Sequence, residues 1–187
     1  MKQNVKTNND TSREVMLTES KTMREGYVKN EEYYDVLDKI KAIPYMTEDM
    51  IVSSEQIANY YEVSTEAIKT IIKRHRDELE EDGITTLKGE ELKNFKNKVC
   101  EVHGEPTKII SNKTTVLTIL TKRAMLRIGM LLTTSPIAKL VRNYLLDCEK
   151  EHTQEKQIWI AKREAGKIDR KRMTTAIANY IPEGKHK

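Results

Sequence analysis

The clearest hydrophobic pattern in the chain runs from Ser53 to Arg76. Apolar residues recur there at helical spacing in two runs, separated by the turn Glu62-Val63-Ser64, so the stretch predicts two helices joined by a tight turn. The small residue Ala58 stands where the two helices would cross. This is the pattern of a helix-turn-helix, whose second helix enters the major groove of DNA.

Local chemistry at the helix ends supports the same division. We expect Ser54 to be the N-cap of the first helix, and Ser64 or Thr65 to be the N-cap of the second. Glu62 departs from the usual motif, because the first turn residue is most often a glycine that adopts a positive φ. That backbone conformation costs another residue about 1 kcal/mol. An ordinary helical hairpin with a charged outer face is therefore the alternative.

The outward face of the second helix carries short polar and basic side chains that can contact base edges or phosphates. These candidates for DNA contact are Ser64, Thr65, Glu66, Lys69, Thr70, Lys73, Arg74 and Arg76. We expect the helix to continue through the acidic run from Asp77 to Asp82 and to stop at Gly83. Because phosphate repels carboxylates, the acidic end must point away from a bound duplex.

The segments before this motif differ in pattern. Residues 1–29 are polar and show little periodicity, which predicts a flexible arm. Tyr33–Ile43 has apolar residues at helical spacing and ends before Pro44, so it predicts a support helix. Met50-Ile51-Val52 predicts a short extended approach to the motif.

A β-hairpin is predicted after the motif. Thr107–Ser111 and Thr114–Ile119 are rich in β-branched residues and are separated by the two-residue turn Asn112-Lys113. The hairpin is either a wing that contacts phosphate through Lys108 and Lys113 or a purely structural element. Two shorter elements are predicted before the hairpin, a β-like run at Ile84–Leu87 and a short helix at Gly89–Asn97.

Three more helices are predicted. Thr121 opens one that reaches Leu132, and Ser135-Pro136 starts the next. Its predicted inward residues are Ile137, Leu140, Val141, Tyr144, Leu145 and Cys148. Glu149–Ile181 predicts a third, long helix, whose apolar stripe must fold back or pair with a second chain. We expect pairing, hence a homodimer or higher homo-oligomer.

These elements predict a mainly α chain with a small β-hairpin, in which a helix-turn-helix domain, with or without a wing, precedes a helical region and a long C-terminal helix. The expected parts are a flexible arm (1–29), a DNA-binding domain (30–98), the hairpin with two helices (99–147) and a basic C-terminal helix (148–187). Residues 156–187 carry nine Lys or Arg against three acidic residues. Such a segment contacts nucleic acid or an acidic protein, or is simply a solvated tail.

No pattern of catalytic or metal-binding residues is present in the sequence. It has no Gly-rich phosphate loop and no catalytic serine elbow, and Cys100-x-x-His103 supplies only two ligands of a zinc site. We therefore expect no enzyme activity, no cofactor and no metal. No run approaches the roughly 18 apolar residues of a membrane span, and no secretory signal is visible, so we expect a cytoplasmic protein.

Two stretches carry a resemblance to known proteins. Ile57–Leu92, taken with Arg123–Asp147, resembles proteins of phages and plasmids of Gram-positive bacteria. Trp159–Ile181 is similar to a C-terminal segment of phage regulatory and antirepressor-type proteins, the Rha- and BRO-like group. The matching residues are Trp159, Arg163, Gly166, Lys167, Arg170, Lys171, Thr174 and Ile177.

The resemblance implies a regulator of a mobile element that binds double-stranded DNA, with no catalysis. The basic residues Arg163, Lys167, Arg170 and Lys171 are then further candidates for DNA contact. The alternative is an antirepressor or anti-defence protein that binds a host or phage protein instead. That alternative depends on the long C-terminal helix and on the acidic run from Asp77 to Asp82.

Overall fold

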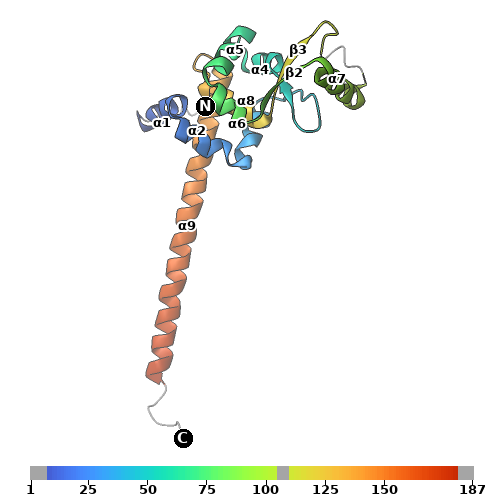
Figure 1. The fold of residues 1–187 in the computed structure, drawn as a ribbon. Coiled ribbons are helices and arrows are strands. Elements are labelled where there is room, and N and C mark those ends of the chain that lie inside the picture. The colour runs from blue at the N-terminus through green and yellow to red at the C-terminus, as the bar shows by residue number, and fades with distance from the viewer. Residues whose placement is uncertain (1–7, 105–109, 181–187) are drawn as a thin grey trace. The chain divides into compact units, whose positions relative to one another are not determined.

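The computed structural model describes the backbone of residues 8–104 and 110–180, and the side chains of residues 12–104 and 110–176. The described chain is mainly helical, with one small antiparallel sheet (Figure 1). It divides into two units, Met1–Leu146 and Asp147–Lys187. The sheet joins segments from both sides of residue 98, so the boundary predicted there does not separate two units.

Two helices occupy most of the segment that was expected to be a flexible arm. They are α1 (Asn8–Glu19) and α2 (Lys21–Val28). Ser20 is the N-cap of α2, and its side chain accepts a hydrogen bond from the backbone N–H of Met23. Leu17, Tyr27 and Val28 are buried in the core. The prediction of a flexible arm is therefore wrong over the described part of 1–29.

The predicted support helix is shorter than Tyr33–Ile43 and begins with a tighter turn. It consists of the 3-10 helix η1 (Glu31–Tyr34) and the helix α3 (Asp35–Ile40). Asn30 caps η1 through its side chain, which accepts from the N–H of Glu32. The chain then reaches β1 (Val52–Ser53). An extended segment was predicted at Met50–Val52, but the strand has only two residues and includes Val52 alone of these three.

The sheet has the strand order β1-β3-β2, and both pairs are antiparallel. Its longer strands are β2 (Ile84–Lys88) and β3 (Val116–Leu120), with Ile84 opposite Leu120 and Lys88 opposite Val116. The β-like run predicted at Ile84–Leu87 is thus confirmed. The predicted hairpin is wrong in its pairing, because β3 pairs with β1 and β2.

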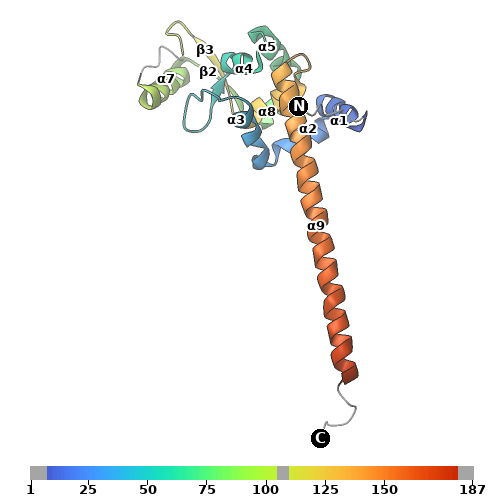
Figure 2. The same cartoon turned by 180° about the vertical axis from the view of Figure 1, so that it is seen from behind.

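Between β2 and β3 lies α7 (Gly89–His103), which is longer than the predicted Gly89–Asn97. Figures 1 and 2 show α7 beside β2 and β3, on the opposite side of this unit from α1. A small apolar cluster of Met46, Val99 and Ile110 holds it there. The first arm of the predicted hairpin, Thr107–Ser111, falls largely outside the described residues, and its buried Ile110 belongs to no strand.

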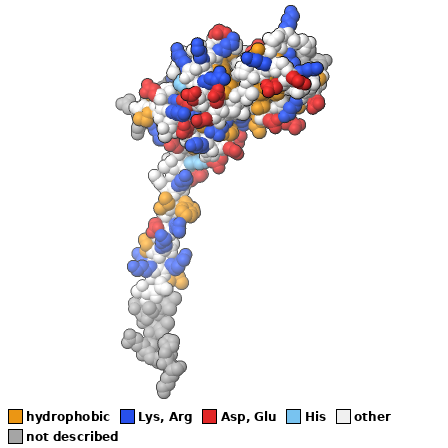
Figure 3. All heavy atoms as spheres, viewed as in Figure 1, with side chains coloured by type: hydrophobic (Ala, Val, Ile, Leu, Met, Phe, Trp, Pro, Cys, Tyr) orange, Lys and Arg blue, Asp and Glu red, His pale blue; other side chains and the backbone are white. Residues whose placement is uncertain are grey.

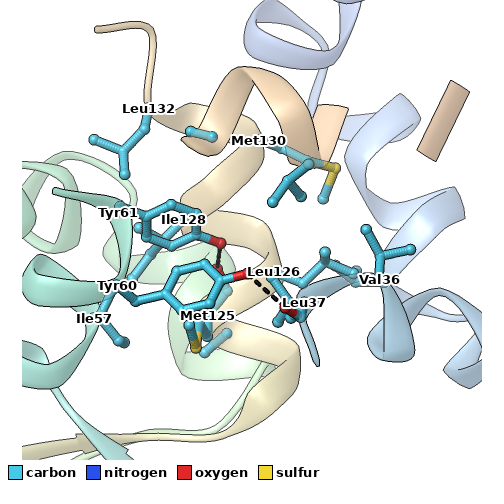
Figure 4. Close-up of a cluster of buried hydrophobic side chains, with 14 of the residues drawn as sticks. Val36, Leu37, Ile57, Tyr60, Tyr61, Met125, Leu126, Ile128, Met130 and Leu132 are labelled. Atoms are coloured by element: carbon cyan, nitrogen blue, oxygen red, sulfur yellow. Dashed lines mark hydrogen bonds between the residues drawn. The ribbon is translucent and has the colours of Figure 1, made fainter. Parts of the chain in front are cut away.

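The centre of the first unit is α8 (Lys122–Leu131), where every residue except Arg123 is buried. Thr121 is its N-cap, as its position predicted. Helices α1, α2 and α5, with η1 and β3, pack around it. Figure 4 shows Met125, Ile128 and other side chains of α8 packed against residues of α3 and α4.

The last helix is α9 (Pro136–Tyr180), which is continuous, whereas two helices were predicted. Ser135 is its N-cap and accepts from the N–H of Ala138. In the first unit Ala138, Val141 and Leu145 are fully buried, but Leu140 is 51% exposed and does not face the core as predicted. From Asp147 to Ala176 no side chain is buried.

Candidate nucleic-acid interface

The predicted pair of helices is present as α4 (Ser54–Tyr61) and α5 (Thr65–Arg74). The N-cap of α4 is Ser53, one residue before the predicted Ser54, because Ser53 forms a reciprocal capping box with Gln56. Ser64 caps α5, and its Oγ accepts from the N–H of Ala67 at 3.2 Å. Both caps fix where the helices begin.

The turn between the two helices is made by Glu62. Its φ of 55° and ψ of 45° lie in the left-handed region, which a non-glycine residue rarely adopts. The N–H groups of Glu62 and Val63 both donate to the carbonyl of Ala58, which closes the end of α4. The carboxylate of Glu62 lies 3.2 Å from Nζ of Lys41. The turn is therefore left-handed at Glu62, where an acidic residue stands in place of the glycine that usually adopts a positive φ.

Tyr61 anchors the end of α4 to the helices behind it (Figure 4). Its hydroxyl donates to the carbonyl of Met125 at 2.9 Å, and its own carbonyl accepts from Oγ of Ser135 at 2.6 Å. A Cβ on Gly129 would lie 2.3 Å from the Tyr61 hydroxyl oxygen, so only glycine leaves room for this ring. Burial raises the pKa of Tyr61 well above its usual value, so the hydroxyl keeps its proton as donor.

One face of α5 packs inward and the other is open to solvent. Ile68 is fully buried, and Ile71 and Ile72 pack against the core. The predicted contact residues Ser64, Glu66, Lys69, Thr70, Lys73 and Arg74 are exposed, and Thr65 is half-buried. The helical periodicity therefore placed these residues correctly on the outer face.

Some of these polar side chains already have partners within the helix. Nζ of Lys69 lies 2.6 Å from a carboxylate oxygen of Glu66, and Oγ1 of Thr70 donates to the carbonyl of Glu66 at 2.8 Å. Ser64 uses its hydroxyl as the cap. The more available cations of α5 are thus Lys73 and Arg74, at its C-terminal end.

The helix does not continue to Gly83 as predicted. It ends at His75, whose φ of −119° and ψ of 34° are not helical, and the short helix α6 (Arg76–Glu81) follows. A surface hollow around this break is lined by four basic residues, Lys21, Lys73, Arg74 and Arg76, and by His75, Asp77 and Glu78. Arg76 also pairs with Glu80 at 2.6 Å. Lys21 comes from α2, and sequence periodicity gave no sign of its position.

The acidic run contributes two carboxylates to a buried network of charges. Glu78 lies 2.7 Å from Arg24 and 2.8 Å from Arg127. Asp82 pairs with Arg127 and with Arg123, the latter at 2.8 Å. Although burial opposes ionisation of Glu78, its hydrogen bonds and charge interactions with Arg24 and Arg127 lower its pKa to about 2. The same carboxylates raise the pKa of Arg127 despite its burial.

This network removes part of the negative charge of the acidic run from the surface. Glu78 and Asp82 are buried and neutralised by arginines, and Glu80 pairs with Arg76. Of this run, Asp77 and Glu81 are exposed and form no ion pair within the part of the chain that the structure describes. The network was not anticipated, because Arg24 and Arg127 lie far from the acidic run in sequence.

The remaining candidates lie on two other segments. Lys113 is exposed in a turn in which the N–H of Thr114 donates to the carbonyl of Ser111 at 3.0 Å. Nζ of Lys96 donates to the carbonyls of Ser111 and Thr114 and so holds this turn against α7. Lys108 lies outside the described residues.

In the second unit, Arg163, Lys167, Arg170 and Lys171 are all exposed on α9. At about 100° per residue they share one side of the helix with Lys156. Figure 3 shows basic and hydrophobic side chains following one another along this helix. Glu164 pairs with Lys167 at 2.7 Å, and the guanidinium of Arg163 lies 5.2 Å from the ring centre of Trp159.

No family model, curated protein or solved structure matches this chain. Within the described residues, no group of three or more His, Cys, Asp or Glu side chains is placed to hold a metal ion. No single helix in that part of the chain is both long and apolar enough to cross a membrane, although the bent pair of α8 and α9 meets the criteria of length and composition together.

Proposed function

We propose that this protein is a sequence-specific DNA-binding regulator that places α5 in the major groove of a duplex. The observation that carries the proposal is the exposed polar and basic face of α5, which the left-handed turn at Glu62 and the buried ring of Tyr61 hold at a fixed angle to α4. A rigid helix with such a face suits direct contact with base edges and phosphates.

The order of elements gives further support. The chain runs β1, α4, α5, α6, β2, α7 and β3, and the sheet order is β1-β3-β2. Winged helix-turn-helix domains have this arrangement of strands around their two motif helices. The β2–β3 pair and the Lys113 turn would then be the wing, with α7 inserted between its strands.

Basic side chains at the C-terminal end of α5 and along α9 supply candidate contacts with a phosphate backbone. Lys21, Lys73, Arg74 and Arg76 line a hollow at the end of α5 together with Asp77 and Glu78, and the carboxylates of Glu78 and Asp82 are paired with arginines. The basic side of α9 from Lys156 to Lys171 supplies a second contact with phosphate. The resemblance to phage and plasmid regulators fits a role in a mobile element, acting as a dimer in a bacterial cytoplasm.

The basic residues at the end of α5 give a direct test of this function. Phosphate contacts release counterions, so each one contributes about −0.9 to the slope of log affinity against log salt. The double variant Lys73→Ala/Arg74→Ala should therefore flatten that slope by about 2, measured by fluorescence anisotropy with duplex DNA. Lys29→Ala, an exposed cation at the end of α2, is the matched control.

An unchanged slope in the double variant, with folding preserved by circular dichroism, would overturn the assignment of α5. That result would favour the second candidate function, an antirepressor or anti-defence protein. It has less support from the acidic run than the sequence suggested, because two of those carboxylates are buried.

A further inference from the structure

The second unit exposes an apolar stripe along one side of α9. Ile158 and Ile168 are 55% and 54% exposed, and Ala161 and Ala165 lie between them on the same side. Their spacings of three, four and three residues follow the helical repeat. An isolated helix leaves such a stripe in water, so its stability in a protein usually comes from a packing partner.

We propose that the partner is the same stripe of a second copy of this chain, in antiparallel orientation. The four residues are placed symmetrically about position 163: an isoleucine lies five residues from it on either side, and an alanine two residues from it on either side. In an antiparallel pair, Ile158 of each copy lies opposite Ile168 of the other, and Ala161 lies opposite Ala165. The large residues thus meet at both ends, and the alanines in the middle allow the two backbones to approach closely.

Charged residues that extend the stripe favour the antiparallel orientation over the parallel one. Glu151 precedes Ile158 by two helical turns, and Arg172 follows Ile168 by one turn. In a parallel pair each Glu151 would face Glu151 and each Arg172 would face Arg172, which is destabilising. In the antiparallel pair, Glu151 of one copy lies within reach of Arg172 of the other at both ends.

The pairing leaves the basic side of α9 open. Arg163, Lys167 and Arg170 project from the side of the helix opposite to the stripe, at about 100° per residue. A paired helix therefore presents a basic surface on each outer side. The pairing does not depend on DNA binding, because it involves different residues and is measured without DNA.

The pairing is tested by sedimentation equilibrium of the full chain without DNA. The protein should dimerise, and Ile158→Glu/Ile168→Glu should raise the dimer dissociation constant by at least about tenfold, because each helix then buries two carboxylates. The matched control is Ile160→Glu, since Ile160 is also 55% exposed but lies on another side of α9. Monomers at every concentration, or equal effects of the double variant and the control, would overturn the proposal.

The orientation is tested by exchanging the two charges. Arg172→Glu and Glu151→Arg should each weaken the dimer, and the double variant Glu151→Arg/Arg172→Glu should restore it. In a parallel dimer, each single variant would only replace one pair of like charges by another. Single variants that leave the dissociation constant unchanged would therefore contradict the antiparallel arrangement, whether or not the protein binds DNA.

Discussion

Tyr61 and Glu62 are adjacent residues that determine how α5 is presented to solvent. Tyr61 reaches into the core, where Gly129 leaves space for its ring and the carbonyl of Met125 accepts a hydrogen bond from its hydroxyl. Glu62 then reverses the chain with a positive φ. Tyr61 packs in the core, whereas the exposed Glu62 only reverses the chain. A substitution at Glu62 should therefore be tolerated more readily than one at Tyr61.

Glu62→Gly should stabilise the protein. Glycine removes the cost of the left-handed conformation, about 1 kcal/mol, and this exceeds the loss of the exposed pair with Lys41. Greater freedom of glycine in the unfolded chain offsets part of the gain, so the expected increase is about 0.5 kcal/mol. The free energy of unfolding in urea measures it.

The control for this change is Glu66→Gly, which places the same substitution inside α5. It should destabilise the protein by about 0.5–1 kcal/mol, because glycine disfavours a helix. If Glu62→Gly also lowered the free energy of unfolding, the left-handed conformation of Glu62 would not be the cost that glycine is expected to remove.

At the scale of elements, α6 links the end of α5 to α2 and α8. The link consists of the pairs that Glu78 forms with Arg24 and Arg127, and those that Asp82 forms with Arg123 and Arg127. Removing one partner would leave a buried charge without compensation, which is strongly destabilising. The acidic run is thus part of the framework that holds α5.

Stability should fall in acid because of Glu78. Its pKa is about 2 in the folded protein, below the usual 4.5, so the folded state binds this proton less readily than the unfolded chain does. The resulting stabilisation, on the order of 3 kcal/mol, is present above about pH 4.5 and is lost as the pH falls towards 2. Urea unfolding at pH 6, above this window, and at pH 3, within it, measures part of this loss.

Two substitutions on α6 separate Glu78 from the other carboxylates. Glu78→Gln should lower stability at neutral pH and reduce the further loss between pH 6 and pH 3, because its side chain no longer titrates. Glu81→Gln, an exposed change on the same helix, should leave the acid dependence close to that of the parent. Equal acid dependence in the parent and Glu78→Gln would exclude this network as the cause.

The elements that local chemistry defines could be predicted from the sequence, and those that distant contacts define could not. Ser64, Thr121 and Ser135 cap helices where their positions suggested. The strand pairing was missed because β2 and β3 are separated by α7. The helices of the N-terminal segment were missed because its buried Arg24 reads as a surface residue until its partner Glu78 is known.

The same distinction applies to the candidate site. Helical periodicity identified the outward face of α5, including Lys73 and Arg74, since that face depends only on the local repeat. Periodicity did not identify Lys21, which arrives from α2, or the end of α5 at His75. The inward position of Glu78 likewise depends on residues of other helices.

At the scale of the whole molecule, each of the two units contributes a different part of the proposed function. The first unit presents α5 from a core built on α8. The second combines a basic side with an apolar stripe, which suits contact with phosphate on one side and with a second copy on the other. A dimer of this kind would contact two half-sites, so its target should have two-fold symmetry.

The most direct test of this account is the selection of fragments of the source genome by the purified protein at about 150 mM salt, where nonspecific contacts with phosphate are partly screened. We predict enrichment of an inverted repeat whose half-sites are separated by a whole number of helical turns. The Lys73→Ala/Arg74→Ala variant should lose the enrichment. Folded protein that enriches no sequence would contradict the central claim that α5 recognises DNA.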